Sequence, residues 1–166
     1  MGDHDNHPSL KNGSCAEEAV IKVLQSVCGA EIERDEDLSP QQCDIASVIS
    51  LVGDVEWSLW LGFPEASAVG LTAEFAGMEL EPDSEDMADA VGELAIMIGG
   101  DTKTRLADFG IGARLSLPSV MSGQGLKVRA RHDQPNRIVH FNTQWGAVWV
   151  ELMAGVKVGE VRQVGS

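Results

Sequence analysis

The residues with the clearest potential for chemistry lie between positions 86 and 105, where the apolar pattern predicts a helix. At 100° per residue, Asp89, Glu93, Ile96 and Gly100 fall on one stripe of that helix, at intervals of four, three and four. The stripe combines two carboxylates with an apolar side chain, and Gly99 beside it would let a second backbone approach closely. Such a stripe has the composition of a docking face.

Ile96 allows two interpretations, because it lies about 200° from Leu94 on the helical wheel. The core stripe of this helix consists of Met87, Val91, Leu94 and Ile98. Single exposed apolar residues are ordinary, and a neighbouring helix expected over residues 65–77 would also account for Ile96 by covering it. The other interpretation makes Ile96 a member of a docking face. The stripe geometry leaves both open.

Three other motifs fit binding sites poorly. His132, Asp133 and His140 have a spacing that matches no metal template, and a Pro-Asn turn accounts for them. The acids of residues 82–89 lack the glycine and the final glutamate of a calcium loop, and they suit a helix N-terminus instead. The run "GGDTKT" lacks the glycine spacing of a phosphate loop. The sequence therefore predicts no metal ion and no cofactor of its own.

The elements that must position these residues can be read from periodicity and from turn residues. Helices are expected over residues 14–28, with Ser14 as N-cap and Gly29 as the stop, from Pro64 to about 77, and over 86–105. Strands are expected on both sides of Gly53-Asp54, in 111–120 and 125–131, and in 137–155 with a turn near Trp145-Gly146. Residues 1–13 are predicted to be a disordered tail, and the acidic stretch 31–42 a solvated loop.

The two halves of the chain look alike. In each half a helix precedes a hairpin, and "ISLVGDVEWSLWLGF" and "HFNTQWGAVWVELMAG" share a glycine turn, a following valine and a tryptophan. This predicts an α+β fold in which a tandem α-β-β duplication forms a mostly antiparallel sheet with packed helices. Residues 14–166 are expected to be a single domain.

Composition excludes several classes of function. Twelve basic residues against 26 acidic ones give a formal charge of -14, which repels nucleic acid and anionic lipid surfaces. No segment is apolar for long enough to span a membrane. The three cysteines lack the spacing of a zinc site and suit reduced thiols in a cytoplasmic protein. A sheet edge or the Trp-bearing hairpins could pair two copies, so a homodimer is possible.

The run "DAVGELAIMIGGDTKTRL", followed by "LSLPSV", resembles the CheX/CheC/FliY family of chemotaxis phosphatases. That family removes phosphate from the aspartyl-phosphate of CheY-type response regulators, and its fold is a tandem repeat. Its signature is Asp or Ser, then Glu, then Asn, with a Pro a little over twenty residues on. Asp89, Glu93 and Pro118 occupy the matching positions, and Ile96 stands in place of the Asn. On the first helix, Ser14, Glu18 and Ile21 have the same spacing.

The resemblance implies a role for each of these residues. In the family, the Glu pairs with a lysine of the receiver domain and the Asn orients the attacking water, while the Mg²⁺ is held by the receiver. Glu93 would keep the anchoring role, with Asp89 as a helper and Gly99, Gly100 and Pro118 as binding residues. Isoleucine has no donor or acceptor to orient water, so phosphatase activity is expected to be weak or absent.

Two functions therefore remain in view. The first is docking of this CheX-like domain to a phosphorylated CheY-type response regulator, with impaired hydrolysis. The second is a non-catalytic adaptor or assembly module, in which Ile96 and the glycine pair form a protein contact, as relatives in the flagellar switch use similar folds for assembly.

Overall fold

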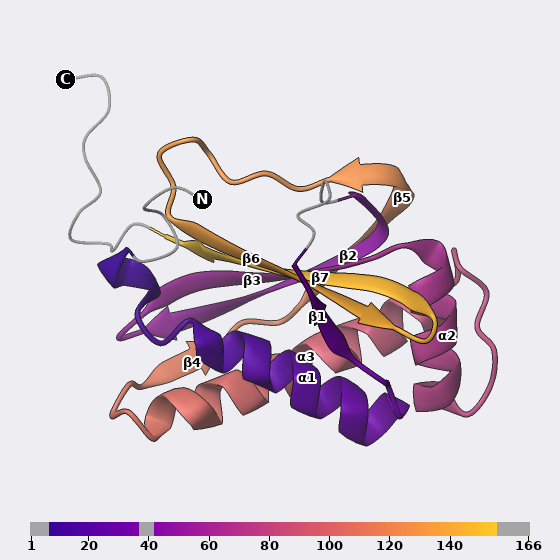
Figure 1. Ribbon diagram of the computed structural model, residues 1–166, viewed down its shortest axis with the longest axis horizontal. Helices are drawn as coiled ribbons and strands as arrows, with labels where there is room; N and C mark the ends of the chain where they lie inside the picture. Colours follow the sequence, from indigo (N-terminus) through magenta and orange to yellow (C-terminus); the bar gives the residue numbers. More distant parts are fainter. Residues whose placement is uncertain (1–6, 37–41, 156–166) are drawn as a thin grey trace.

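The computed structural model describes residues 7–36 and 42–155. The chain forms one antiparallel sheet with α helices packed on one side of it (Figure 1). The elements in chain order are the 3-10 helix η2 (Pro8–Leu10), α1 (Ser14–Cys28), β1 (Glu33–Asp35), β2 (Gln42–Gly53), β3 (Glu56–Phe63), α2 (Glu65–Ala76), α3 (Glu85–Ala107), β4 (Ala113–Leu115), β5 (Ser119–Lys127), β6 (Asn136–Thr143) and β7 (Gly146–Ala154). The predicted α+β fold is confirmed.

The sheet shows the predicted duplication. Its strand order is β1-β6-β7-β3-β2-β4, and β5 also pairs with β2. The two hairpins, β2–β3 and β6–β7, meet where β3 pairs with β7, and Leu59 lies opposite Leu152 in that ladder. Each half also lends a strand to the hairpin of the other half, because β1 pairs with β6 and β5 pairs with β2. The two halves are therefore interlocked.

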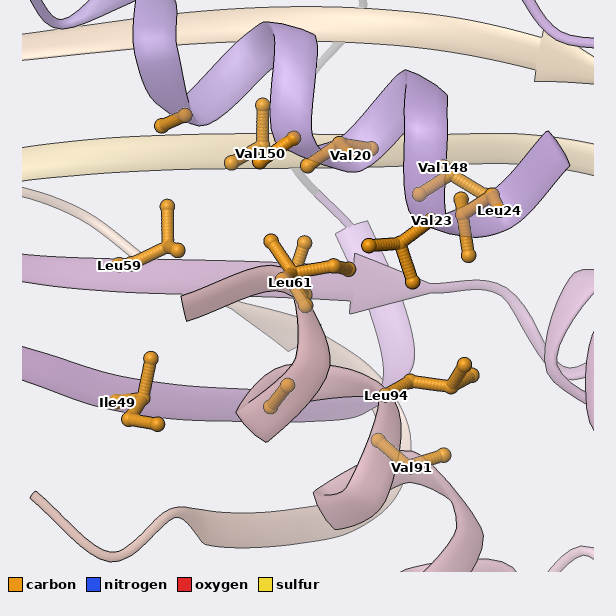
Figure 2. Close-up of a cluster of buried hydrophobic side chains, with 14 of the residues drawn as sticks. Val20, Val23, Leu24, Ile49, Leu59, Leu61, Val91, Leu94, Val148 and Val150 are labelled. Atoms are coloured by element: carbon orange, nitrogen blue, oxygen red, sulfur yellow. The ribbon is translucent and has the colours of Figure 1, made fainter. Parts of the chain in front are cut away.

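The main core lies between the helices and one face of the sheet. Alternate residues of β2, β3 and β7 point toward the helices, as the period of two in a strand requires. Figure 2 shows the centre of this core, with side chains from α1, α3 and the three strands in contact. The labelled residues are Val20, Val23, Leu24, Ile49, Leu59, Leu61, Val91, Leu94, Val148 and Val150.

The other face of the sheet carries a smaller cluster. Trp149 lies flat over Gly62 on the neighbouring strand, where an added Cβ would lie 1.9 Å from the indole ring. The ring reaches across β3, and its Nε1 donates a hydrogen bond to the carbonyl of Gln42 at 3.3 Å. Cys43 and Ala46 complete this cluster. Only glycine at position 62 permits this packing of a tryptophan across a strand.

Five local predictions were wrong. The predicted tail is ordered from His7, because Leu10 is buried in the core and Ser9 accepts a hydrogen bond from the Trp57 indole at 2.7 Å; residues 1–6 lie outside the described part. Ser14 is the first residue of α1, and Gly13 occupies the N-cap. The stretch 31–42 contains β1. The strand expected over 111–120 is split into β4 and the start of β5. The strand expected over 125–131 ends at Lys127 as part of β5.

None of the described helices is long and apolar enough to cross a membrane. The three cysteines are free and buried, as reduced thiols would be. Burial raises the pKa of Cys28 and of Cys43 to about 11. These two thiols are therefore protonated at neutral pH and are poor nucleophiles.

Candidate functional site

The candidate site lies on α3, whose ends are well defined by the sequence. Ser84 is the N-cap, and its hydroxyl accepts a hydrogen bond from the Met87 amide at 3.1 Å. Glu85 and Asp86 in the first turn and Arg105 in the last turn complement the helix dipole. Val91 and Leu94 are buried in the main core, and Figure 2 labels both among the core side chains. One side of this helix is thus fixed by the core.

The other side of α3 carries the predicted stripe. Asp89 and Glu93 are exposed, and Ile96 is 39% exposed. Ile96 does not belong to the residues packed against the core, and its exposure shows that α2 does not bury it. Among the described residues, neither Asp89 nor Glu93 takes part in an ion pair. We call Asp89, Glu93 and Ile96 the α3 ridge.

Pro118 lies beside the α3 ridge. It falls in the short connection between β4 and β5, and a Cβ placed on Gly92 would lie 3.7 Å from Pro118 Cγ and 3.7 Å from Val120 Cγ2. Gly92 directly precedes Glu93 in the helix. The edge of the sheet therefore lies within ordinary contact of α3 next to the ridge, although Pro118 is 25 positions away from Glu93 in the sequence.

Gly99 is not part of the exposed surface, which corrects its predicted place beside the docking stripe. It is buried, and a Cβ on it would lie 3.2 Å from Leu115 Cδ2 and 3.3 Å from Ile49 Cδ1. Gly99 thus serves the contact between α3 and the sheet of its own domain. Gly100 is only half-buried and has nothing within 4 Å of an added Cβ. Gly100 alone of the pair remains open to a partner.

The equivalent residues of α1 have a different environment. Glu18 is exposed, but its carboxylate lies 3.0 Å from Arg105 Nη1 on α3. Arg105 also binds Asp101 at 2.6 Å, and hydrogen bonding to Asp101 raises the pKa of Arg105 further. Ile21 packs against the core. Glu18 therefore ties α1 to α3, and Ile21 serves the core.

Neither Asn136 nor Asn142 stands in for an Asn at position 96. Asn136 donates a hydrogen bond to Glu151 at 3.1 Å, and Asn142 donates one to Asp35 at 3.0 Å. In β6 these residues alternate with Val139 and Phe141, which face the helices and the main core. Both amides therefore lie on the side of the sheet away from the α3 ridge.

Glu151 is a buried acid that the sequence did not point to. It is 1% exposed on the helix-free face of β7, and its Oε1 has no hydrogen-bond partner among the residues that the structure describes. Burial raises its pKa to about 7, while the hydrogen bond from Asn136 lowers it. The only signal in the sequence was an acid in an otherwise apolar strand. His132 is exposed in a turn and His140 is buried in β6, and the described residues contain no group of three metal-ligating side chains.

The chain is similar to known chemotaxis proteins. Residues 45–142 match the family described as "Chemotaxis phosphatase CheX". The CheY-P phosphatase CheX of Thermotoga maritima is 27% identical over 117 residues, which are 68% of this chain and 76% of that protein. The crystal structure of chemotaxis protein CheX from Vibrio vulnificus gives a TM-score of 0.78 at 24% identity, and the match covers 86% of this chain and 98% of the other.

A third match is a chain of the CheX-CheY-BeF3-Mg²⁺ complex from Borrelia burgdorferi. It gives a TM-score of 0.68 at 19% identity and covers 85% of this chain and 95% of the other. At these levels of identity the two structural matches establish the fold. They show that the interlocked sheet with α1 and α3 on one face is a known architecture.

Proposed function

The chain belongs to the CheX family of chemotaxis phosphatases, and we propose that it docks onto a phosphorylated CheY-type receiver domain through the α3 ridge. The single observation that carries this proposal is the exposure of Asp89, Glu93 and Ile96 on one side of a helix whose other side is locked into the core. The Borrelia burgdorferi protein of the same fold was crystallised as a complex with CheY, BeF3 and Mg²⁺. That complex supports a receiver domain as the partner.

Glu93 is the proposed anchor. It is exposed and forms no ion pair within the described residues, so a cation of the partner can reach it without first displacing an internal one. A charge-assisted hydrogen bond to a lysine would then fix the register of α3 on the receiver. Asp89 lies one turn earlier on the same ridge and adds to the negative potential there. Any Mg²⁺ in the complex is expected to come with the receiver.

A separate question is whether this chain, once docked, accelerates hydrolysis of the receiver acyl phosphate. The receiver supplies the phosphoryl group, so the docked partner has mainly to hold one water in line behind phosphorus. A carboxamide accepts a proton from that water and donates to the phosphoryl oxygens without adding charge. Ile96 has neither function, and no described asparagine replaces it on the ridge. We propose that this chain binds the receiver and accelerates its dephosphorylation weakly or not at all.

The test is the decay of receiver phosphate with the wild-type chain and with Ile96→Asn. The wild type is expected to leave the decay close to its intrinsic rate, and Ile96→Asn is expected to accelerate it by about 10²-fold, within the range for a positioned catalytic group. Val52→Asn is the control, since Val52 is 44% exposed on β2 next to Leu51, which faces the core. Strong acceleration by the wild type would contradict the proposed impairment.

The adaptor hypothesis predicts a different result in the same experiment. An adaptor that uses Ile96 as a plain protein contact would bind its partner equally well whether or not a receiver is phosphorylated. It would also gain no hydrolysis from Ile96→Asn, because no phosphoryl group would lie at position 96. Binding measured with and without BeF3 on the receiver therefore separates the two functions.

A further inference from the structure

Leu117 is a large apolar side chain held out into solvent on a rigid support. It is 88% exposed, more than any other large apolar residue of the described chain. The backbone before it is fixed, because the Ser116 amide donates to the Ser50 carbonyl at 2.9 Å and the Ser50 amide donates to Ser116 Oγ at 2.9 Å. Pro118 restricts the backbone after it. The exposure of Leu117 is thus a feature of the ordered fold.

The segment that carries Leu117 runs beside the α3 ridge. Two distances show this. A Cβ added to Gly99 would lie 3.2 Å from Leu115 Cδ2, and a Cβ added to Gly92 would lie 3.7 Å from Pro118 Cγ. Residues 115–118 therefore follow the flank of α3 from Gly99 back to Gly92. Ile96 lies between these two glycines in the helix. Leu117 and Ile96 thus border the same stretch of surface, at which Glu93 and Asp89 are also exposed.

The N-terminal half of α3 carries charge of one sign. The sequence contains no lysine or arginine between Arg34 and Lys103. Glu85 and Asp86 are exposed on the same part of α3 as Asp89 and Glu93. No described ion pair includes any of these four acids. Within the described residues these acids have no cationic partner, so a cationic group of the binding partner can complement them, and the two apolar side chains require an apolar surface next to it.

We propose that Leu117 is the apolar anchor of the docking surface and that, together with Ile96, it selects CheY-type receivers in which an apolar patch borders the cationic side chain. This inference rests on the proposed function. In this chain Ile96, which stands at the position of the catalytic amide, takes part in the binding contact. Leu117 supplies affinity through burial, and Glu93 supplies orientation through charge.

The experiment measures the dissociation constant for a purified CheY-type receiver of the same organism, activated with BeF3 and Mg²⁺. Leu117→Ser is expected to raise Kd about tenfold, which corresponds to about 1.4 kcal/mol. Leu117→Met is expected to stay within about twofold of the wild type, because it keeps the apolar volume. Phe109→Ser is the control: Phe109 is 63% exposed just beyond the C-terminal end of α3, about 20 Å along the helix from Ile96.

The outcomes separate this inference from the proposed function. If Leu117→Ser binds like the wild type while Glu93→Gln binds more weakly, the receiver docks on the ridge and Leu117 is not its anchor. If Phe109→Ser weakens binding as much as Leu117→Ser, the apolar contribution is not local to the ridge, and the inference is wrong. If none of the activated receivers binds the wild type, the proposed function is overturned, and this inference is overturned with it.

Discussion

Two glutamates occupy matching positions in the two halves of the molecule and have opposite environments. Glu18 on α1 and Glu93 on α3 follow a Ser or Asp by four residues and precede an isoleucine by three. Glu18 is bound to Arg105 of the neighbouring helix, and Ile21 after it packs against the core. Glu93 has no ion pair in the described structure, and Ile96 after it is exposed.

The difference shows how a duplicated fold can keep one docking helix and lose the other. The ion pairs Glu18–Arg105 and Lys22–Asp101 place α1 antiparallel to the C-terminal half of α3. The α3 ridge lies in the N-terminal half, before Asp101, so these contacts do not reach it. The same spacing in the sequence therefore gives a paired glutamate on α1 and an exposed one on α3, because packing decides what each helix face contacts.

The largest expected effect comes from removing each glutamate in turn. Glu93→Ala is expected to raise the Kd for an activated receiver about 100-fold, as truncation of a central charged residue in an interface does. Glu18→Ala is the matched variant and is expected to change Kd by less than about twofold. Isothermal titration calorimetry would measure both. Equal losses in the two variants would mean that α1 and α3 both dock, contrary to the comparison.

A third glutamate sharpens the comparison through pH. Because burial raises the pKa of Glu151 to about 7, the folded state binds a proton more tightly than the unfolded state. The free energy of unfolding should therefore fall as pH rises from about 4.5 to about 7. Glu151→Gln stays neutral and should escape that fall. At pH 8 Glu151→Gln is expected to be more stable than the wild type by about 2 kcal/mol. This figure already includes a cost of about 1 kcal/mol for leaving the glutamine amide without a hydrogen-bond partner.

Urea unfolding at pH 5 and at pH 8 checks this prediction. Glu93→Gln is the matched control, because it makes the same substitution at an exposed position. If Glu151→Gln followed the same pH dependence as the wild type, Glu151 would not be the titrating group. The stability change would then have to be assigned elsewhere before binding data at different pH values are compared.

The sequence predicted the parts of this fold that depend on local periodicity. The end of α1 at Gly29, the hairpin turn at Gly53 and the core stripe of α3 all follow from residues within one or two turns of each other. Ile96 lies about 200° from Leu94 on the helical wheel, and its exposure in the structure agrees with one of the two interpretations that the sequence left open. Local pattern therefore identified the candidate site and the orientation of its helix.

Distant contacts account for what the sequence did not predict. β1 is three residues long, and its partner β6 lies more than 100 residues away, so its acidic residues look like a loop. The helical wheel could not show that the β4 edge packs against the flank of α3, and for this reason Gly99 was assigned to the surface. Leu10 looked like part of a polar tail, although it completes the core. In each case the deciding partner is remote in sequence.

The smallest expected effect separates the two adjacent glycines, and with them the two sides of α3. Replacing a helical glycine by alanine adds about 1 kcal/mol of helix propensity when the new methyl group has room. At Gly100 nothing lies within 4 Å of the added Cβ, so Gly100→Ala is expected to be more stable by about 0.5–1 kcal/mol. At Gly99 the methyl group meets Leu115 at 3.2 Å and Ile49 at 3.3 Å, tighter than ordinary contact.

Gly99→Ala is therefore expected to be less stable than Gly100→Ala by about 1 kcal/mol, because repacking Ile49 and Leu115 offsets the gain in propensity. Urea denaturation of the two variants side by side measures the difference, with the wild-type protein as the common reference. Equal stabilities would mean that Gly99 has as much space as Gly100. The sheet edge would then not press against α3 at this point, and the inward side of the helix would no longer be distinct from the ridge that is proposed to dock.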